Sequence, residues 1–394
     1  MSGPAIRPGN PAPQPGLYIG LISGTSMDAV NAVLAEISAQ DFRVLAARSV
    51  AFPAPLLERV RRLSIPGTSP ASPDGVDAID ELGELDHLVG ELFAGAAIGL
   101  LAARGIGPQD VTAIGSHGQT VRHRPRTARP FTLQIGDPNI IAARTGITVV
   151  ADFRRRDVAL GGEGAPLVPA FHAATFSDPG ECRAVLNLGG IANLTLLEPD
   201  HPVTGFDTGP ANGLMDAWTR RHLDQPFDAC GAWAASGTVA PALLEALLEH
   251  PFLRLPPPKS TGPEDFTLAW LDAQVDAAGQ PEPDAVQATL CEYTAVTVAD
   301  ALGARPPARL IVCGGGVHND HLMARLAARL PETRIESSAA HGVDPEQVEA
   351  AAFAWLAART LAGLPGNLPS VTGARQAAVL GAIWPGAATG RSAG

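Results

Sequence analysis

The sequence predicts an α/β protein built from two related halves. Two segments about half a chain apart share one pattern, in which an apolar strand, a turn of small residues and a second apolar strand follow one another: LYIGLISGTSMDAV (17–30) and RAVLNLGGIANLTLLE (183–198). A chain of 394 residues is also too long for one ordinary core, which favours two domains. A strand–turn–strand opening excludes the usual dinucleotide fold, where a glycine-rich turn leads into a helix.

The remaining elements follow from local patterns along the chain. Short apolar runs that end in small or polar residues are typical of buried parallel strands, and apolar residues at helical spacing predict helices. Pro- and Gly-rich residues 1–15 predict a disordered tail. The expected strands are 17–22, 30–37, 43–50, 111–116, 147–152, 183–198 with its turn, 203–206 and the run that starts at 309. The expected helices are 79–104, 212–222, 239–249, 266–277, 284–304, 318–330 and 346–362.

Composition excludes several classes of protein. The net charge is −12 and the densest basic patch is the short run RRR (154–156), so nucleic acid is not expected as a partner. The N-terminal residues lack the apolar region of a secretory signal, and the apolar run 92–103 is too short to span a membrane. The chain is therefore expected in the cytoplasm. Buried, reduced thiols are expected because no CxxC pair occurs among Cys182, Cys230, Cys291 and Cys313.

Three small-residue turns could hold a nucleotide. A phosphate chain is best held by backbone N–H groups in a tight turn where Gly, Ser or Thr allows close approach. Gly24-Thr25-Ser26 and Gly189-Gly190 have this composition, and Asp28 could meet the Mg²⁺ that accompanies a triphosphate. Gly314-Gly315-Gly316 could accept a base and ribose. Each turn taken alone is equally well explained as a plain connector, and no GxxxxGK[ST] motif is present.

A set of motifs extends along almost the whole chain. The motifs are GTSMDAVN (24–31), IGSHGQTVRH (114–123), QIGDPNIIA (134–142), VVADFRRRDVALGGEGAPLVPAFH (149–172), LNLGGIAN (186–193), GFDTGPANGLMDAW (205–218), PKSTGPEDF (258–266) and CGGGVHN (313–319). In these motifs the chain resembles the anhydro-N-acetylmuramic acid kinases, which belong to the actin/hexokinase/Hsp70-like ATPase superfamily. The resemblance covers about 17–384 and is specific, because other sugar kinases of the superfamily generally lack this set of motifs.

The resemblance implies two actin-like, ribonuclease H-like domains around a central nucleotide cleft. We expect the N-terminal domain to comprise 16–145 plus 366–390, and the C-terminal domain to comprise 146–365. It also implies the reaction. The substrates are ATP and 1,6-anhydro-N-acetylmuramic acid, a product of peptidoglycan turnover. Water opens the anhydro bridge at C1 and the γ-phosphate moves to O6, which gives N-acetylmuramic acid 6-phosphate. A homodimer is left open.

The reaction needs a base to activate water, and Asp207 in GFDTGP stands where the family has its catalytic base. The alternative is that Asp207 caps the helix near 212–222. Lys259, the chain's one lysine, could assist phosphoryl transfer or be unrelated to it. The full nucleotide set expected is Gly24, Thr25, Ser26, Met27, Asp28, Ala29, Val30, Asn31, Gly189, Gly190, Lys259, Gly314, Gly315 and Gly316, with Asp28 as the magnesium ligand.

Substrate contacts are expected where open α/β sheets place ligands, just after strand ends. The candidates are His117, with Gln119 beside it, Thr120, Asp152, Arg155, Arg156 and Glu349. Arg155 and Arg156 would suit the lactyl carboxylate. Structural salt bridges or capping roles are equally open for each of them.

Four positions depart from the family pattern, and two rival functions remain open. Gly and Asp are usual where this chain has Ala29 and Asn31, Gln is usual at Glu163, and Gly is usual at Ala211. One rival is a kinase of the same fold that acts on another amino sugar or hexose. The other is a chaperone-like or mechanical ATPase, which would need an additional binding domain that the chain has no room for.

Overall fold

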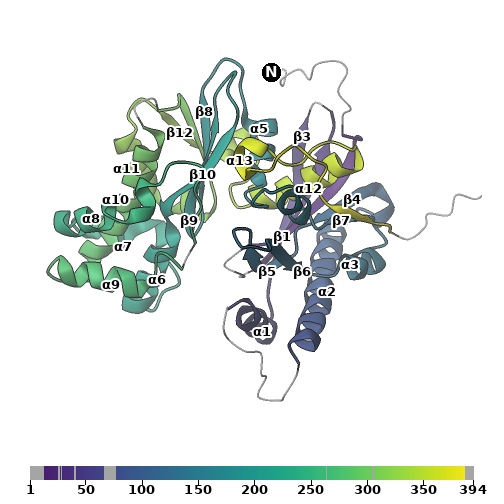
Figure 1. Cartoon of the computed structure of the whole chain (residues 1–394), viewed down its shortest axis with the longest axis horizontal. Helices are drawn as coiled ribbons and strands as arrows, with labels where there is room; N and C mark the ends of the chain where they lie inside the picture. Colours follow the sequence, from purple (N-terminus) through teal and green to yellow (C-terminus); the bar gives the residue numbers. More distant parts are fainter. Residues whose placement is uncertain are drawn as a thin grey trace, which may run out of the picture. The chain divides into compact units, whose positions relative to one another are not determined.

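The computed structural model divides the chain into two compact units. Unit 1 comprises 1–171 and 349–394, and unit 2 comprises 172–348. Figure 1 shows that the C-terminal elements of the chain, in yellow, belong with the N-terminal elements of unit 1. The predicted cleft between the two domains stays a prediction. The residues that the structure describes are 13–24, 27, 29–39, 41–65, 77–262, 264–303 and 306–386.

Unit 1 is built on a six-stranded sheet with the order β13-β7-β4-β1-β2-β3. Strands β1 to β3 form an antiparallel meander, β4 and β7 run parallel to β1, and β13 pairs antiparallel with β7. Strands β5 and β6 form a separate hairpin. The strands are β1 (Gly16–Ser23), β2 (Ala29–Ile37), β3 (Phe42–Ala51), β4 (Val111–Ser116), β5 (Gln119–Arg124), β6 (Phe131–Ile135), β7 (Val149–Ala151) and β13 (Ala382–Trp384).

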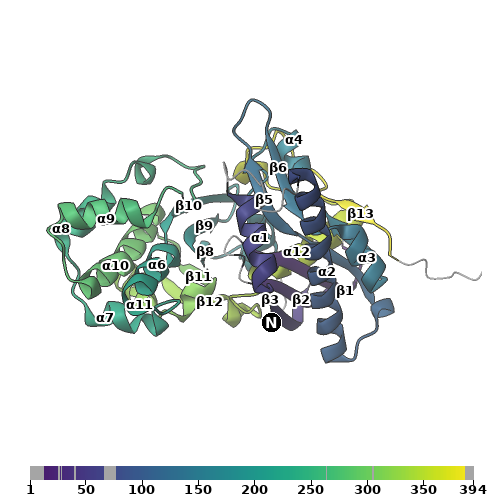
Figure 2. The ribbon, with the colours of Figure 1, turned by 90° about the horizontal axis from the view of Figure 1, so that it is seen from below.

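The helices of unit 1 cover both faces of this sheet. They are α1 (Ala54–Ser64), α2 (Ala78–Arg104), η1 (Pro108–Asp110), α3 (Pro138–Thr145), α4 (Arg155–Ala159), α5 (Val168–Phe176), α12 (Val348–Leu361) and α13 (Pro369–Thr372). Helix α2 begins at the N-cap Asp77 and ends at Gly105, whose φ of 64° suits glycine. By length and composition it could cross a membrane, but half of its most apolar stretch is buried. It packs on β1, β2 and β3, and its buried residues join their core cluster, which makes it a core helix of unit 1 (Figure 2).

Helix α12 packs on the face of the sheet opposite α2 because two glycines let its backbone come close. Gly20 of β1 and Gly115 of β4 are register partners. A Cβ atom on Gly20 would fall on the carbonyl oxygen of Ala350, and one on Gly115 would fall on that of Phe353. Side chains alternate along a strand, so the neighbours Ile19 and Leu21 join the α2 core instead.

This packing makes the domain boundaries differ from those predicted at 145 and 365. Residues 146–151 belong to unit 1 because β7 continues its sheet next to β4. Helix α12 belongs there too, because its backbone contacts β1 and β4 directly. The unit boundaries therefore fall within α5 and at the start of α12.

Unit 2 repeats the same strand plan. Its sheet has the order β10-β9-β8-β11-β12, in which β8 to β10 form an antiparallel meander and β11 and β12 run parallel to β8. Five strands of unit 1 have the corresponding order β3-β2-β1-β4-β7. This shared strand order confirms the predicted duplication and the ribonuclease H-like, actin-like fold. The strands are β8 (Arg183–Leu188), β9 (Ile191–Leu197), β10 (Thr204–Pro210), β11 (Arg309–Cys313) and β12 (Arg334–Ser337).

The core of unit 2 lies between this sheet and the buried helix α10, which contacts α6, α7, α8 and α11 (Figures 1 and 2). The helices are α6 (Asn212–Leu223), η2 (Ala229–Gly231), α7 (Ala232–Ser236), α8 (Pro241–Leu248), η3 (Pro251–Arg254), α9 (Leu268–Ala277), α10 (Pro283–Leu302), η4 (Gly315–His318), α11 (Asp320–Arg329) and η5 (Ser338–His341).

Candidate functional site

Asp207 lies inside β10, at a β-bulge, rather than after a strand that ends at 206. It faces Asn193 of β9, and the next register pair joins Gly209 to Ala192, so Thr208 is an extra residue. Gly209 has a φ of 148°, a conformation that L-residues rarely adopt. Bulges bend a strand and redirect its side chains, and they are common beside active sites. The GFDTGP sequence therefore places a bulge directly after Asp207.

A loop from another part of unit 2 holds the Asp207 carboxylate. Its Oδ2 atom accepts hydrogen bonds from Ser260 Oγ at 3.1 Å and from the Thr261 backbone N–H at 2.9 Å. The Asp207 backbone N–H donates to the carbonyl of Lys259 at 3.0 Å. The alternative role as a helix cap is wrong, because the N-cap of α6 is Ala211 and no side chain caps that helix.

Lys259 points back into unit 2. Its Nζ atom donates to the carbonyls of Phe252 at 3.3 Å and Leu253 at 3.0 Å, and it lies 4.7 Å from the centroid of the Phe252 ring. Burial lowers the pKa of Lys259, while the charge of Asp207 raises it. The ammonium group therefore binds the last carbonyls of η3 while staying within electrostatic reach of Asp207.

The two predicted glycine turns of unit 2 meet at one end of its sheet. The β8–β9 turn contacts the start of α6, since the Gly190 carbonyl accepts from the Ala211 and Gly213 backbone N–H groups at 3.0 and 3.1 Å. The 314–316 segment lies against the end of β8, because a Cβ on Gly316 would contact Leu188 and Asn212. Parallel strands β8 and β11 both end here, which is where ligands bind in open α/β sheets.

Two glycines at this edge of the sheet leave space beside the backbone for a ligand. An added Cβ on Gly190 or Gly315 would meet no atom within 4 Å, whereas one on Gly314 would run into Asn187 and Leu188. Gly314 also has a φ of 81°, so its glycine is required by the backbone itself. The open glycines are the ones that a phosphate or ribose could contact directly.

In unit 1 the predicted turn is described only in part. Thr25, Ser26 and Asp28 lie outside the described residues. The Met27 backbone N–H donates to the Gly24 carbonyl at 3.1 Å, and Met27 has a φ of 58°. Ala29, Val30 and Asn31 continue as β2, and the side chains of Met27 and Val30 are buried in the core. These two residues could contact a nucleotide through their backbone only.

His117, which is buried, forms a pair with the half-buried Arg154. Its Nε2 atom accepts a hydrogen bond from Arg154 Nε at 2.8 Å, and its Nδ1 lies 2.8 Å from the Gly118 carbonyl. These partners assign the proton to Nδ1. Burial, followed by the charge of Arg154, lowers the pKa of His117 well below its usual value. His117 is therefore neutral, and its Nε2 orients Arg154 while the Gly118 carbonyl holds its Nδ1.

Arg154 is a further candidate, which the sequence analysis did not select beside Arg155 and Arg156. Its NH1 group also donates to the Gly164 carbonyl at 2.8 Å. Burial lowers the pKa of Arg154 to about 10, while the charges of Glu349 and Asp157 raise it. Arg155 and Arg156 are exposed, and Arg155 forms an ion pair with Asp152 at 3.5 Å. Its position in the sequence could have indicated this residue, because Arg154 is the arginine nearest the buried strand β7.

The other predicted substrate residues also lie in unit 1. The pKa of Glu349, at the start of α12, is raised by desolvation, and the Arg154 charge partly offsets the shift. The pKa of Asp152 is also raised by desolvation, and its φ of 58° is a strained conformation for a non-glycine residue. Thr120 accepts a hydrogen bond from Gln134 at 3.1 Å, and Gln119 donates to the Thr120 carbonyl at 3.0 Å.

Asp157 organises the loop beside Arg154 and was not predicted. It is fully buried, and its carboxylate accepts from Asn367, Thr372 and the Gly164 backbone N–H, each at 2.7 Å. The carboxylate thus joins its own loop, through Gly164, to the 367–372 segment more than two hundred residues later. The neighbouring Glu163, a departure from the family pattern, binds Arg126 through both carboxylate oxygens, at 2.7 and 3.0 Å. Ala211, another departure, is the N-cap residue of α6, with a φ of −122° and a ψ of −113°.

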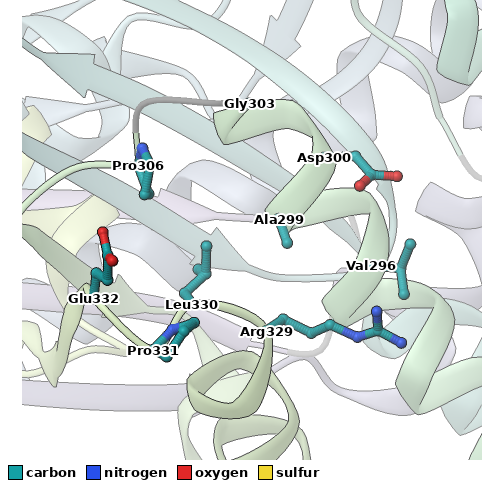
Figure 3. A pocket seen from close by; sticks show the side chains of 9 residues that line it. All are labelled: Val296, Ala299, Asp300, Gly303, Pro306, Arg329, Leu330, Pro331 and Glu332. Atoms are coloured by element: carbon teal, nitrogen blue, oxygen red, sulfur yellow. The ribbon is translucent and has the colours of Figure 1, made fainter.

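A pocket of about 300 Å³ lies elsewhere in unit 2, between α10 and the 329–332 segment (Figure 3). Its lining includes Asp300, Glu332 and Arg329, and Arg329 already pairs with Glu292. None of the residues expected at the site lines it. We therefore assign the candidate site to the strand ends described above and not to this pocket.

Comparisons with known proteins agree with these motifs. A model of the family "Anhydro-N-acetylmuramic acid kinase" matches residues 16–386. The anhydro-N-acetylmuramic acid kinase of Xylella fastidiosa is 54% identical over 381 residues, which cover 95% of this chain and 98% of that protein. The protein of the same name from a Shewanella species is 52% identical over 366 residues, which cover 92% of this chain and 97% of that protein.

Solved structures are more distant. Component A of (R)-2-hydroxyglutaryl-CoA dehydratase from Acidaminococcus fermentans is 13% identical, with a TM-score of 0.46. The match covers 87% of this chain and 99% of that one. Because this score is below 0.5, the fold assignment rests on the strand order of the two sheets.

Proposed function

This chain belongs to the anhydro-N-acetylmuramic acid kinase family, and from that premise we propose how its residues divide the work. The enzyme is an ATP-dependent kinase of 1,6-anhydro-N-acetylmuramic acid. Water adds to C1, the C1–O6 bond of the anhydro bridge breaks, and O6 takes the γ-phosphoryl group of ATP. The products are N-acetylmuramic acid 6-phosphate and ADP. The observation that carries this function is the match to the family across residues 16–386.

Asp207 is the base that takes the proton from the attacking water. Water is a poor nucleophile at neutral pH and needs a carboxylate or imidazole within hydrogen-bond reach. The bulge at Thr208 and the two hydrogen bonds to Oδ2 support this role, because together they fix the plane of the carboxylate. His117 is not suited to the task, since both of its ring nitrogens are engaged.

ATP binds through glycine turns. In unit 2 the Gly189-Gly190 turn takes phosphate oxygens and the 314–316 segment takes the base and ribose. In unit 1 the 24–31 segment takes the remaining phosphate oxygens. The open backbone at Gly190 and Gly315 supports this assignment. Phosphoryl transfer asks mainly for positioning and charge neutralisation, which backbone N–H groups can supply.

Magnesium binds together with ATP. Among the described residues, no three His, Cys, Asp or Glu side chains cluster in a way that could hold a metal. This fits Mg²⁺ in kinases, which is usually held by one or two carboxylates plus substrate phosphates and water. We propose Asp28 as the carboxylate, and the bound ion would neutralise charge on the phosphates. Because the reaction consumes ATP, we place the enzyme in the cytoplasm.

The sugar binds at the strand ends of unit 1. Its lactyl carboxylate is an anion, and arginine suits carboxylates because its N–H groups form a fork. Arg154 is the preorganised candidate, because His117 and the Gly164 carbonyl fix its orientation. Arg155 and Arg156, which are exposed, contribute at longer range. Asp152, Glu349 and Thr120 are the proposed contacts to hydroxyl groups.

Substrate choice tests the function directly. We expect the purified chain with Mg-ATP to convert 1,6-anhydro-N-acetylmuramic acid to a 6-phosphate, with ADP formed in equal amount. In water enriched in ¹⁸O, the label should enter at C1 and not in the phosphate. Coupled ADP release and mass spectrometry measure both. Phosphorylation of glucose or N-acetylglucosamine without turnover of the anhydro sugar would contradict the assignment.

A methyl group on an open glycine should weaken ATP binding without harming the fold. We expect Gly190→Ala to raise the KM for ATP about tenfold, which corresponds to about 1.4 kcal/mol of lost binding, while the melting temperature stays unchanged. The reason is that the new Cβ meets no protein atom and occupies the space where phosphate approaches. Gly180→Ala, at a turn of unit 2 remote from the strand ends, is the matched control. Equal KM values for both variants would remove Gly190 from the ATP site.

A further inference from the structure

The loop 258–262 is attached to unit 2 through the chain's one lysine. Two carbonyls at the end of η3, those of Phe252 and Leu253, accept hydrogen bonds from Lys259 Nζ. The ammonium group also lies against the Phe252 ring, 4.7 Å from its centroid, as in a cation–π contact. Phe252 itself is buried in the core of unit 2. The side chain of Lys259 thus fastens the loop to a rigid part of the domain.

The same loop makes the described contacts to the proposed base. The backbone carbonyl of Lys259 accepts from the Asp207 N–H, and the next two residues, Ser260 and Thr261, donate to its Oδ2. Thr261 is in turn fixed by Asp265, which accepts from its hydroxyl at 2.6 Å. Residue 259 therefore connects η3 to Asp207 through its side chain on one side and its backbone on the other.

We propose that Lys259 is a positioning residue for Asp207 and not a ligand of the ATP phosphates. It holds the loop so that Ser260 and Thr261 fix the carboxylate plane, and its positive charge favours the ionised form of the base. The inference rests on the proposed function only in taking Asp207 as the base. It replaces the expectation from sequence that Lys259 binds ATP, because a side chain aimed at Phe252 and Leu253 is turned toward its own domain.

Two variants of Lys259 separate the two roles. Lys259→Met removes the charge and the donors at similar length. We expect a 10- to 100-fold loss in kcat, a KM for ATP within twofold of the natural enzyme, and an acid limb of the kcat–pH profile that moves to higher pH. Lys259→Arg, which keeps charge and donors, should restore the limb and most of kcat. A tenfold rise in the KM for ATP with an unmoved limb, or no change at all, would overturn the proposal.

Ser260→Ala covers the case in which Lys259→Met fails to fold. This variant leaves the lysine anchor in place and removes one hydrogen bond to Asp207. The acid limb should again move to higher pH, by less than in Lys259→Met, with the KM for ATP unchanged. An unmoved limb here would also overturn the proposal. Glu264→Gln, next to the loop, serves as the control and should leave the profile unchanged.

A readout without turnover keeps this test separate from the test of the function. Reductive methylation with ¹³C-formaldehyde converts Lys259, the only lysine, to a dimethyl form that keeps its charge. We expect its NMR signal to be shifted upfield by the Phe252 ring, to titrate at lower pH in Asp207→Asn, and not to respond to Mg-ATP. A signal that moves with Mg-ATP and ignores Asp207→Asn would assign Lys259 to the nucleotide, whatever sugar the enzyme uses.

Discussion

Asp207→Asn is expected to lower kcat by about 10²- to 10⁴-fold, the usual contribution of a general base. An amide keeps the size of the carboxylate and can still accept from Ser260 and Thr261 through its oxygen, but it cannot take a proton from water. ATP should bind as before, because the glycine turns are untouched. Single-turnover assays measure the rate, and calorimetry with a non-hydrolysable ATP analogue measures the binding.

The control for this variant is Asp276→Asn. Asp276 is an exposed residue of α9 in the same unit, and it accepts a local hydrogen bond from Gln280. Its replacement should leave kcat unchanged. If Asp207→Asn kept near-normal turnover, Asp207 would not be the base and the proposed route for the water proton would have to be abandoned.

Gly20→Val is expected to destabilise the enzyme more than an ordinary core substitution. Any Cβ at residue 20 falls on the Ala350 carbonyl, so α12 must move away from β1 or the strand must distort. Overpacking of this kind costs about 1–3 kcal/mol in well-packed cores, and the obstacle here is backbone, so we expect about 3 kcal/mol or more. Urea denaturation followed by circular dichroism measures the loss.

Gly83→Ala is the matched control in the same unit. Gly83 lies on the exposed side of α2, and an added Cβ there meets no atom within 4 Å. Alanine is the better helix former by about 0.5–1 kcal/mol, so this variant should be slightly more stable than the natural chain. Equal stabilities for Gly20→Val and Gly83→Ala would show that α12 does not depend on close approach to the sheet.

Much of the fold could be predicted from the sequence, because long apolar runs and helical spacing are local signals. The strands 17–22 and 30–37 and the helix 79–104 match β1, β2 and α2 to within a residue or two. The allocation of α12 to unit 1 could not be predicted, since it depends on glycines in β1 and β4 more than two hundred residues earlier. The β5–β6 hairpin was also missed, because its strands carry several polar residues.

The sequence could indicate which residue types belong to the candidate site, but not which partners those residues contact. The glycine turns and Asp207 carry their chemistry in the local sequence, and the strand order brings the two turns of unit 2 together. Arg154 and Asp157 were not chosen, because their importance comes from burial and from partners such as His117, Asn367 and Thr372. Lys259 was noticed in the sequence because it is the only lysine. The direction of its side chain is known only from its hydrogen bonds to Phe252 and Leu253.

The packing of α12 has a consequence for biosynthesis. A ribosome releases the strands of unit 1 first, yet the helix that covers β1 and β4 is translated only after residue 348. Unit 2 is one continuous stretch of chain, so it can fold as soon as it has emerged. The face of the nascent N-terminal sheet that α12 covers therefore stays exposed until residues 348–361 have been synthesised. A chaperone that shields apolar strands during translation would act on this interval.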